Sequence, residues 1–489
     1  MQIETRSIDY IPLAERHGKV SELASVWFAG GAQLGCLATG VVGIAAGLNL
    51  AWNTVAIVLG SALGTFFMAF HSTQGPQLGL PQMIQSRPQF GRRGALLVWG
   101  VALVNYIGYN AFSQVLAGQT MHELLRIEPH VTLTVFTGAA LVIAIFGYDS
   151  IHAIQKPLSY LLMLCMLIFS IGTVVLHVPF GDLSRQTFQA VPFLTQLFTA
   201  TAYQLSWSIY VSDYSRYLPR DVGVAASFFW TYFGALLGGA WMMEVGALVA
   251  VMNPHLEVAA AIIKSGNSVM PGLGVTLLAA AAAGLLTVTS INLYGGSLTV
   301  LSAADSIRPI QYTRRNRIYS LLLIGVASSA VALMIKGDYV SGFSDLLTIL
   351  LYIFTPWTSI NLVDFYFVRR GYYSIREMFR ADGMYGQWNW RGLVAYAAGF
   401  AAMIPFFSTG FYVGPVARLL GGADLAMIVG LPVSAVTYLL ACRSMDLAAE
   451  RRRAIEADRG LEADLPRSGH SCEGVGQGEG PRRHGDAEL

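Results

Sequence analysis

The feature that most constrains this chain is a series of apolar runs, each about 20 residues long, that recurs from residue 24 to residue 442. A helix rises about 1.5 Å per residue, so about 20 apolar residues cross the roughly 30 Å hydrocarbon core of a bilayer. Charged residues make up 12% of the chain, about half the share found in soluble domains. The chain is therefore predicted to be an all-α polytopic membrane protein.

Hydropathy predicts twelve transmembrane helices, at about 24–48, 54–72, 95–121, 131–149, 157–178, 193–215, 225–252, 272–303, 318–336, 343–368, 392–411 and 424–442. If the N-terminus is cytoplasmic, the inside segments hold 26 of the 31 Lys and Arg residues and the outside loops hold five. Positive residues favour the cytoplasmic side. We therefore expect a multi-pass protein of the cell membrane with both termini in the cytoplasm.

Three regions follow from this pattern. Residues 1–23 form a cytoplasmic N-terminal segment, residues 24–442 form the twelve-helix domain, and residues 443–489 form a cytoplasmic tail. The tail opens with a basic stretch around Arg451 that is suited to an interfacial helix, then becomes rich in Gly, Glu, Ser and Arg. Such a composition cannot bury a core, so the tail is predicted to be largely disordered.

Enzyme and metal signatures are missing from the sequence. It has no HExxH, GxSxG or Walker A motif, and its four cysteines form no CxxC pair. Lys and Arg lie in short loops and not along a stripe with interleaved aromatic residues, which disfavours a nucleic-acid partner. We expect a non-enzyme without metal or cofactor that works as a monomer.

The sixth predicted span ends in the most polar stretch of the membrane domain, Trp207 to Arg220. An unsatisfied polar group in hydrocarbon costs several kcal/mol, so this stretch should face protein, a cavity or water. Trp207 is suited to stacking on a planar ligand, with Tyr203 and Gln204 one turn earlier facing the same space. Asp213 and Arg216, nearer the cytoplasmic end, are interpreted as an ion pair or gate.

The first span contains Gly30 and Gly31 followed by Gln33. Glycines cost a helix roughly 1 kcal/mol each relative to alanine, and small residues also allow membrane helices to pack closely. The pair followed by a polar Gln33 favours a helix break that frees backbone carbonyls near a ligand. In the third span, Asn110 and Gln114 lie four residues apart on one helix face. Their amides suit either the edge of a heterocycle or hydrogen bonds between helices.

Spans seven and eight carry the remaining polar candidates. Glu244 is a carboxylate within an apolar run, which suggests either proton coupling or a hydrogen-bonded structural role. Thr287 and Ser290 are candidate cation ligands, although such hydroxyls can also bond to the preceding helical turn. Asn292 is a candidate for bonding a ligand amide.

Three segments resemble nucleobase–cation symporter family 1, and most closely its purine–cytosine permease branch. They are the loop GPQLGLPQMIQSRPQFG from Gly75, the segment SDYSRYLPRD from Ser212, and INLYGGSLTVLS from Ile291. The resemblance extends from about Ser21 to Cys442. It implies a leucine-transporter (LeuT) type fold, with two inverted repeats of five helices plus two further helices, in which the first helix of each repeat is unwound at mid-membrane.

The resemblance also implies where a substrate lies. Family contacts match Gly31 and Gln33 in span one, Asn110 with Gln114 adjacent in span three, Trp207 in span six and Asn292 in span eight. Members that couple to sodium place it between span-one carbonyls and two hydroxyls of span eight. The second of those positions holds Ile291 here, and Ser206 stands where members usually carry glycine before the tryptophan.

The resemblance, together with these residues, implies a symporter that imports a nucleobase such as cytosine or a purine, with a proton favoured over sodium. The candidate coupling residues are Gly30, Thr287, Ser290 and Glu244. The alternatives are a permease for allantoin, hydantoin or a vitamin precursor (hydroxymethylpyrimidine or pyridoxine), or a non-transporting membrane receptor or scaffold.

Overall fold

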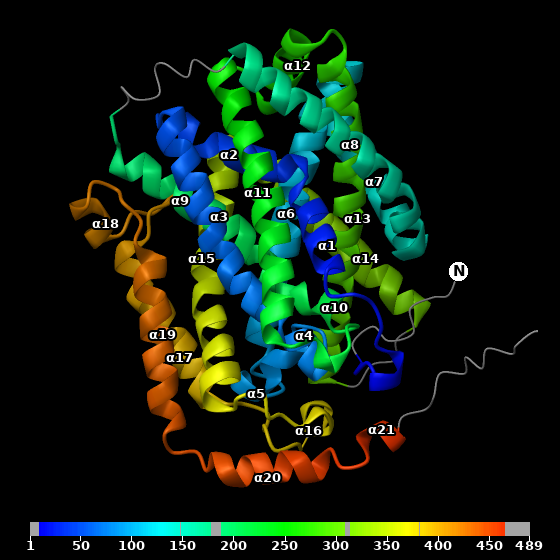
Figure 1. Ribbon diagram of the computed structural model, residues 1–489, viewed down its shortest axis with the longest axis vertical. Coiled ribbons are helices and arrows are strands. Elements are labelled where there is room, and N and C mark those ends of the chain that lie inside the picture. The colour runs from blue at the N-terminus through cyan, green and yellow to red at the C-terminus, as the bar shows by residue number, and fades with distance from the viewer. Residues whose placement is uncertain (1–8, 147, 178–186, 309–312, 381, 465–489) are drawn as a thin grey trace, which may run out of the picture.

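The computed structural model describes residues 9–146, 148–177, 187–308, 313–380 and 382–464. Within these ranges every regular element is a helix, apart from one isolated bridge between Ser408 and Val413. The long helices run side by side and form a bundle, with α12 at its upper end, α18 at its left side and α16 and α20 at its lower end (Figure 1).

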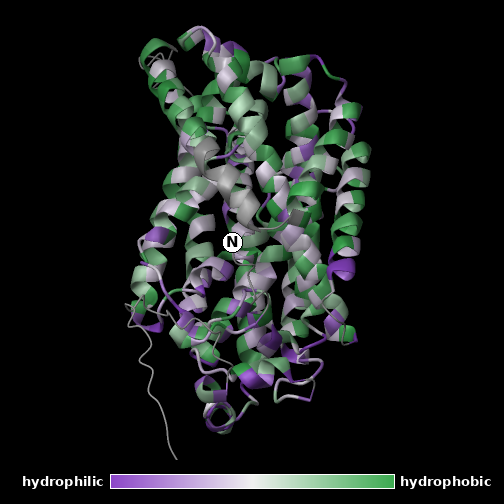
Figure 2. Ribbon diagram, turned by 90° about the vertical axis from the view of Figure 1, so that its right-hand side faces the viewer, coloured by the Kyte–Doolittle hydropathy of each residue, from purple (hydrophilic) through white to green (hydrophobic). Residues whose placement is uncertain are grey.

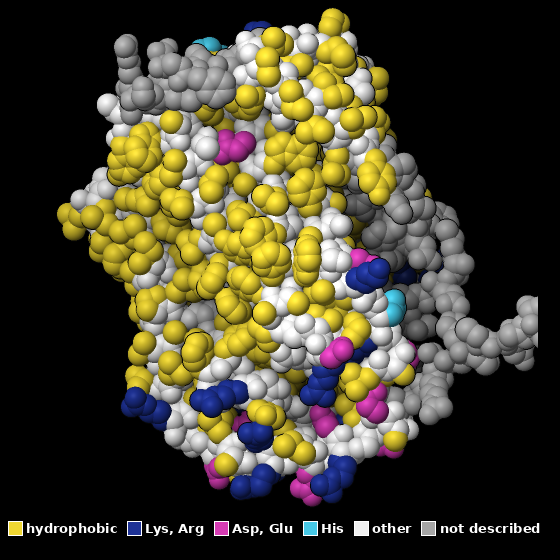
Figure 3. All heavy atoms as spheres, in the orientation of Figure 1, with side chains coloured by type: hydrophobic (Ala, Val, Ile, Leu, Met, Phe, Trp, Pro, Cys, Tyr) yellow, Lys and Arg dark blue, Asp and Glu magenta, His cyan; other side chains and the backbone are white. Residues whose placement is uncertain are grey.

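The long helices form the body of the bundle. They are α3 (Leu50–Ser72), α6 (Leu96–Leu125), α7 (Pro129–Phe146), α8 (Tyr148–His177), α11 (Val224–Met252), α13 (Leu273–Ile307), α14 (Arg314–Met334), α15 (Tyr339–Val363), α17 (Trp390–Met403) and α19 (Ala426–Cys442). Hydrophobic residues follow these helices along their length (Figure 2), and apolar side chains form a broad belt on the surface, below which Lys and Arg gather (Figure 3).

The described part of the chain contains six helices that are long and apolar enough to cross a membrane, or up to eight if each of two bent helix pairs is one span. Shorter apolar stretches occur at Pro129–Ile145 and Tyr160–Leu176. These helices and the apolar belt are those of an integral membrane protein. The number twelve stays a prediction.

The first predicted helix is broken, as its glycines indicated. α1 (Glu22–Gly31) and α2 (Leu34–Ala45) meet at an angle of 57°, and Gln33 between them is extended, with φ −140° and ψ 162°. The break lies close to α11. A Cβ atom on Gly31 would lie 2.6 Å from the backbone nitrogen of Gly239, so only glycine allows this approach.

A second break follows α9 (Ala190–Ser206). The chain tightens into the 3₁₀ turn η4 (Trp207–Ile209), passes through Tyr210 and continues as α10 (Val211–Ser215). This arrangement divides the stretch that was most polar in the sequence, so that Trp207 lies at the break and Asp213 lies in α10. The Asp213 carboxylate accepts a hydrogen bond of 2.9 Å from the backbone nitrogen of Gln82.

Short helices cover the two ends of the bundle. They are η1 (Leu13–Glu15), α4 (Gln74–Leu78), η2 (Ile84–Ser86), α5 (Arg87–Phe90), η5 (Arg220–Val222), α12 (Val258–Val269), the π-helical turn η6 (Asp364–Val368), α16 (Ile375–Phe379), η7 (Ile404–Phe406), α18 (Pro415–Leu419), α20 (Leu447–Ala457) and α21 (Leu461–Asp464).

The loop at 74–91 packs beneath the bundle and is largely buried. Its glutamines bond to the membrane helices and to the turn that follows α15: Gln74 Nε2 donates to Asn361 Oδ1 at 2.8 Å, and Gln89 Nε2 donates to Asp364 Oδ2 at 2.7 Å. Asp364 is fully buried and pairs with Arg369 at 2.5 Å. The lower end is therefore closed around α15 by a polar network.

The start of the tail is folded, and the basic stretch around Arg451 lies in helix α20. Helix α20 crosses the lower end (Figure 1), and Glu450 accepts from Arg369 Nε at 2.6 Å. Asp458 accepts from the backbone nitrogens of Ile375 and Arg376, at 2.7 and 3.1 Å. These carboxylates find partners on distant loops, which composition does not reveal. Residues 465–489 lie outside the described residues.

Candidate functional site

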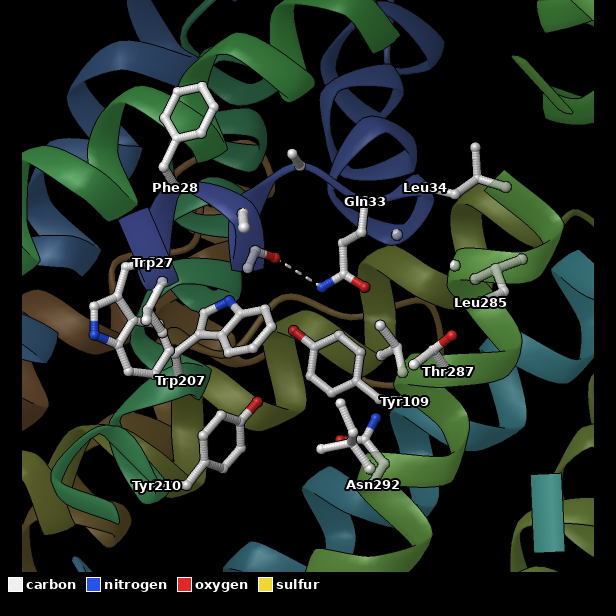
Figure 4. A pocket seen from close by; sticks show the side chains of 18 of the residues that line it. Trp27, Phe28, Gln33, Leu34, Tyr109, Trp207, Tyr210, Leu285, Thr287 and Asn292 are labelled. Carbon is white, nitrogen blue, oxygen red and sulfur yellow. Dashed lines mark hydrogen bonds between the residues drawn. The ribbon is translucent and has the colours of Figure 1, made fainter. Parts of the chain in front are cut away.

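A cavity of about 1290 Å³ lies between the two broken helices and helices α6 and α13. It begins beside the α1–α2 break and extends along α1 and α10 as far as Arg216 and Tyr217. Most of its wall is apolar or aromatic, with a few polar groups that converge near the two breaks (Figure 4). Concave, mostly apolar sites with a few placed polar groups are typical of small-molecule binding.

Aromatic side chains surround the second break. Trp207 lies edge to face with Tyr210, at 5.5 Å between ring centroids, and with Trp27, at 6.0 Å. Tyr109 of α6 lies 6.0 Å from Tyr203, again edge to face. Because these rings contact one another by their edges, the half-buried Trp207 is held in place while it borders the cavity.

Two amides and two hydroxyls face the aromatic groups. Gln33 lies at the first break, where its Nε2 donates to Gly30 O at 3.2 Å and to Tyr203 Oη at 2.9 Å. Asn292 and Thr287 reach the cavity from α13, and Ser113 reaches it from α6. Figure 4 shows Gln33, Tyr109, Trp207 and Asn292 around one space. Such a set can hold a flat ring against an aromatic face and bond to its edge.

Half of the residues predicted from the sequence line this cavity. They are Gly30, Gln33, Tyr203, Trp207, Thr287 and Asn292. The other six lie elsewhere: Gly31, Asn110, Gln114, Gln204, Ser290 and Glu244.

Two of the six pack against α11. Gly31 touches its backbone, and Gln204 Nε2 donates to Ala235 O at 3.0 Å. Glu244, on α11 itself, accepts from Thr54 Oγ1 of α3 at 2.9 Å. Ser290 donates to Leu286 O at 2.8 Å, within its own helix. These positions serve contacts between or within helices.

Asn110 and Gln114, predicted either to contact the edge of a heterocycle or to bond neighbouring helices, do not line the cavity. α6 turns Tyr106, Tyr109 and Ser113 toward the cavity, and neither amide is on that face. Gln114 Oε1 instead accepts from Ser329 Oγ of α14, at 3.0 Å. The physical reason is a rotation of the helix: successive residues differ by about 100° in direction, so Asn110 points well away from Tyr109.

Tyr109, Ser113 and Tyr210 are cavity residues that the sequence interpretation did not include. Tyr106 and Phe112, on the same helix, also line the cavity. The spacing of Tyr106, Tyr109 and Ser113, three and four residues apart, was the available signal, because such residues share one helix face.

Comparison with known proteins agrees with this arrangement. Residues 10–430 match the family described as permeases for cytosine/purines, uracil, thiamine and allantoin. The putative purine-cytosine permease YxlA of Bacillus subtilis is 35% identical over 441 residues, which cover 90% of this chain and 95% of that protein. The chain belongs to this permease family. The predicted membership of nucleobase–cation symporter family 1, in its purine–cytosine permease branch, is thereby confirmed.

More distant members cover as much of the chain. The purine-cytosine permease fcyB of Emericella nidulans is 22% identical, over 90% of this chain and 88% of its own length. The structure of Mhp1, a nucleobase-cation-symport-1 family transporter with bromovinylhydantoin bound, superposes with a TM-score of 0.73 at 17% identity. It covers 95% of this chain and 100% of Mhp1. The permease therefore shares the LeuT-type fold of Mhp1.

Proposed function

We propose that this permease is a secondary active transporter that imports a planar nitrogenous heterocycle, with cytosine or a purine as the leading substrate, together with a proton. The observation that carries the proposal is the meeting of Trp207 and Tyr109 with the amides of Gln33 and Asn292 around one cavity. Stacking on an aromatic side chain is worth about 1–3 kcal/mol per base, and amides supply both donors and acceptors for a ring edge.

The proposed topology has twelve transmembrane spans, in two inverted repeats of five plus two helices, in the cell membrane. Both termini are in the cytoplasm, which matches the Lys and Arg that gather at the lower end in Figure 3. In this orientation the cavity extends toward the cytoplasm, along α1 and α10. We infer that the structure represents a conformation from which substrate leaves to the cell interior.

One position supports a proton as the coupling ion. Ile291 stands where sodium-coupled members of the family carry the second of two hydroxyls on this helix, so that a sodium ion would lack one of its ligands. The membrane potential supplies about 2.3 kcal/mol per charge per 100 mV to drive uptake. Glu244, in an apolar helix and bonded to Thr54, is the proposed proton carrier.

The test of substrate class is uptake of labelled cytosine by cells that lack their own permease, with competition by adenine, hypoxanthine, uracil, allantoin, hydantoin and pyridoxine. We expect saturable uptake that cytosine or a purine competes most strongly. Competition by allantoin, hydantoin or pyridoxine alone would move the assignment to those ligands. No uptake of any of them by folded protein in the membrane would identify a receptor or scaffold instead.

Coupling is tested with the Glu244→Gln variant and with a change of ions. We expect uptake to collapse with a protonophore and to be indifferent to sodium at fixed pH. Glu244→Gln should retain binding and exchange of substrate but lose accumulation against a gradient. Uptake that requires sodium and resists the protonophore would rule out the proton.

A further inference from the structure

The direction of the hydrogen bonds at the end of α9 can be read from the chemistry of the partners. Ser206 Oγ lies 2.7 Å from Tyr203 O and 2.9 Å from Tyr109 Oη. A carbonyl oxygen only accepts, and a serine hydroxyl carries one hydrogen. Ser206 therefore donates to Tyr203 O, and the Tyr109 hydroxyl must donate to Ser206 Oγ.

This direction is a consequence of the second helix break. At the end of α9 the Trp207 nitrogen donates to Gln204 O and not to Tyr203 O. The Tyr203 carbonyl is thus left without its α-helical partner. It is a strong acceptor in a low-dielectric site and needs a donor. Ser206 supplies that donor, so its hydrogen is not available to Tyr109.

The amide of Gln33 is oriented by the same reasoning. Its Nε2 lies 3.2 Å from Gly30 O, which only accepts, and 2.9 Å from Tyr203 Oη. Both hydrogens of the amide nitrogen are used in these two contacts, and Oε1 is left for other partners. Figure 4 shows the Gln33 nitrogen turned to the break and its oxygen turned the other way, toward Leu285 and Thr287.

We propose that Ser206, through Tyr109, and Gln33, through Tyr203, make one side of the cavity an acceptor wall, and that this wall selects heterocycles that present N–H donors to it. The acceptor wall consists of Tyr109 Oη and Gln33 Oε1. Ser206 is a positioning residue, because it acts through Tyr109. The inference rests on the proposed function and specifies its substrate class: aminated bases over their oxo counterparts.

Cytosine and uracil are a matched pair for this wall. They share size and shape, but the exocyclic amino group of cytosine is a carbonyl in uracil, and the adjacent ring nitrogen N3 accepts in cytosine and donates in uracil. The wall distinguishes them when it faces the exocyclic group. An amino group donates to Tyr109 Oη or Gln33 Oε1. A carbonyl at the same place would set its lone pairs against those of Tyr109 Oη or Gln33 Oε1, and these oxygens would be left without a hydrogen-bond donor. Sites that bond a substrate N–H reject analogues without it far more strongly than apolar sites do.

The experiment measures binding of cytosine and uracil to the purified full-length protein, by competition with one labelled ligand. We expect the parent to prefer cytosine by tenfold or more. In Ser206→Ala the Tyr109 hydroxyl is free to donate into the cavity, so the preference should fall by about tenfold, mainly through better uracil binding. Ser208→Ala is the matched control: its buried Oγ has no hydrogen-bond partner within the described residues and it does not line the cavity.

Tyr109→Phe removes the acceptor and should reduce the preference by a similar factor, which tests the wall even if Ser206→Ala does not fold. In the double variant, adding Ser206→Ala to Tyr109→Phe should change the preference no further. A structural role for Ser206 would instead weaken both ligands equally and leave their ratio unchanged, and that result would overturn the inference.

Failure of the inference is distinguishable from failure of the proposed function. If the parent binds no nucleobase, the proposed substrate class fails. If the parent binds cytosine or adenine but Ser206→Ala and Tyr109→Phe leave the ratio to uracil intact, the function stands and the acceptor wall is wrong. A parent that prefers uracil over cytosine also overturns the wall.

Discussion

Helix α1 ends at Gly31 and helix α9 ends at Ser206, and both ends border the cavity. At the first end the released Gly30 carbonyl accepts from the side chain of Gln33, three residues further along. At the second end the Tyr203 carbonyl accepts from Ser206, three residues further along. At each break a nearby polar side chain therefore donates to the freed backbone carbonyl. Gln33 itself lines the cavity, and Ser206 contacts the cavity residue Tyr109.

The surroundings of the two breaks differ. The first break packs against the backbone of α11. A Cβ atom on Gly31 would lie 2.6 Å from Gly239 N, and a Cβ atom on Gly40 would lie 1.8 Å from Met243 O. The second break rests on aromatic side chains, Trp27, Tyr109 and Tyr210. Backbone contacts allow little adjustment, whereas rings can change rotamer. We infer that the first break is a fixed point that presents the Gln33 amide, and that the second is an adaptable wall that binds the ring.

The largest effect should follow from disturbing the fixed point. Gly40→Ala places a methyl group against the α11 backbone, so α2 and α11 must separate. We expect a loss of about 3 kcal/mol or more, seen as a lower melting temperature and yield in detergent. Gly35→Ala is the control in the same helix, because nothing lies within 4 Å of its Cβ. Equal melting of the two variants would show that the first break is not held by backbone contact.

The next effect concerns the adaptable wall. Trp207→Ala removes the ring at the second break, and ligand binding should weaken by roughly 10- to 100-fold, as expected for about 1–3 kcal/mol of stacking. Folding should change less than in Gly40→Ala. Trp52→Ala is the control, since Trp52 packs on Phe188 and Phe193 and does not line the cavity. Unchanged affinity in Trp207→Ala would show that stacking on Trp207 does not contribute to ligand binding.

Both breaks could be predicted from the sequence, because a glycine pair before Gln33 and a polar stretch after an apolar run are local signals. The sequence could not predict how α6 is rotated, that is, which of its faces points to the cavity. In a soluble helix the polar face points to water, but in a membrane helix polar residues turn inward both to a cavity and to neighbouring helices. Asn110 and Tyr109 are one residue apart, and composition does not say which of the two helix faces is the cavity.

The docking of the tail was equally hidden. Asp458 caps the first turn of α16 and Glu450 pairs with Arg369, yet these partners are about 80 residues apart in the chain. A local reading of residues 443–464 finds a basic helix and few apolar residues. The segment is ordered by two of its own carboxylates, Glu450 and Asp458, which accept hydrogen bonds from Arg369 and from the first turn of α16. Only the fold brings these groups together.

A smaller effect should separate hydrogen bonding to the edge of the ligand from stacking on the face of its ring. Gln33→Ala removes the acceptor at the first break and leaves Gly30 O without its donor. We expect ligand binding to weaken about tenfold, as for one or two lost hydrogen bonds, with Trp207 stacking intact. The double variant Gln33→Ala, Trp207→Ala should then lose the sum of the two free energies. Strong non-additivity would mean that the two breaks bind the ligand as one unit.

The smallest effect is expected at the α6 amides, which the family resemblance places near the substrate but which do not line the cavity. If edge recognition belongs to the first break and Asn292, then Gln114→Ala should change ligand affinity by less than twofold. Gln114 bonds Ser329 of α14, so the cost should appear in stability, at about 1 kcal/mol. Ser113→Ala, one residue earlier and on the cavity face, is the matched comparison and should weaken binding more. If Gln114→Ala weakened binding more than Ser113→Ala did, α6 would have to rotate during transport, because only a rotation brings that amide to the cavity.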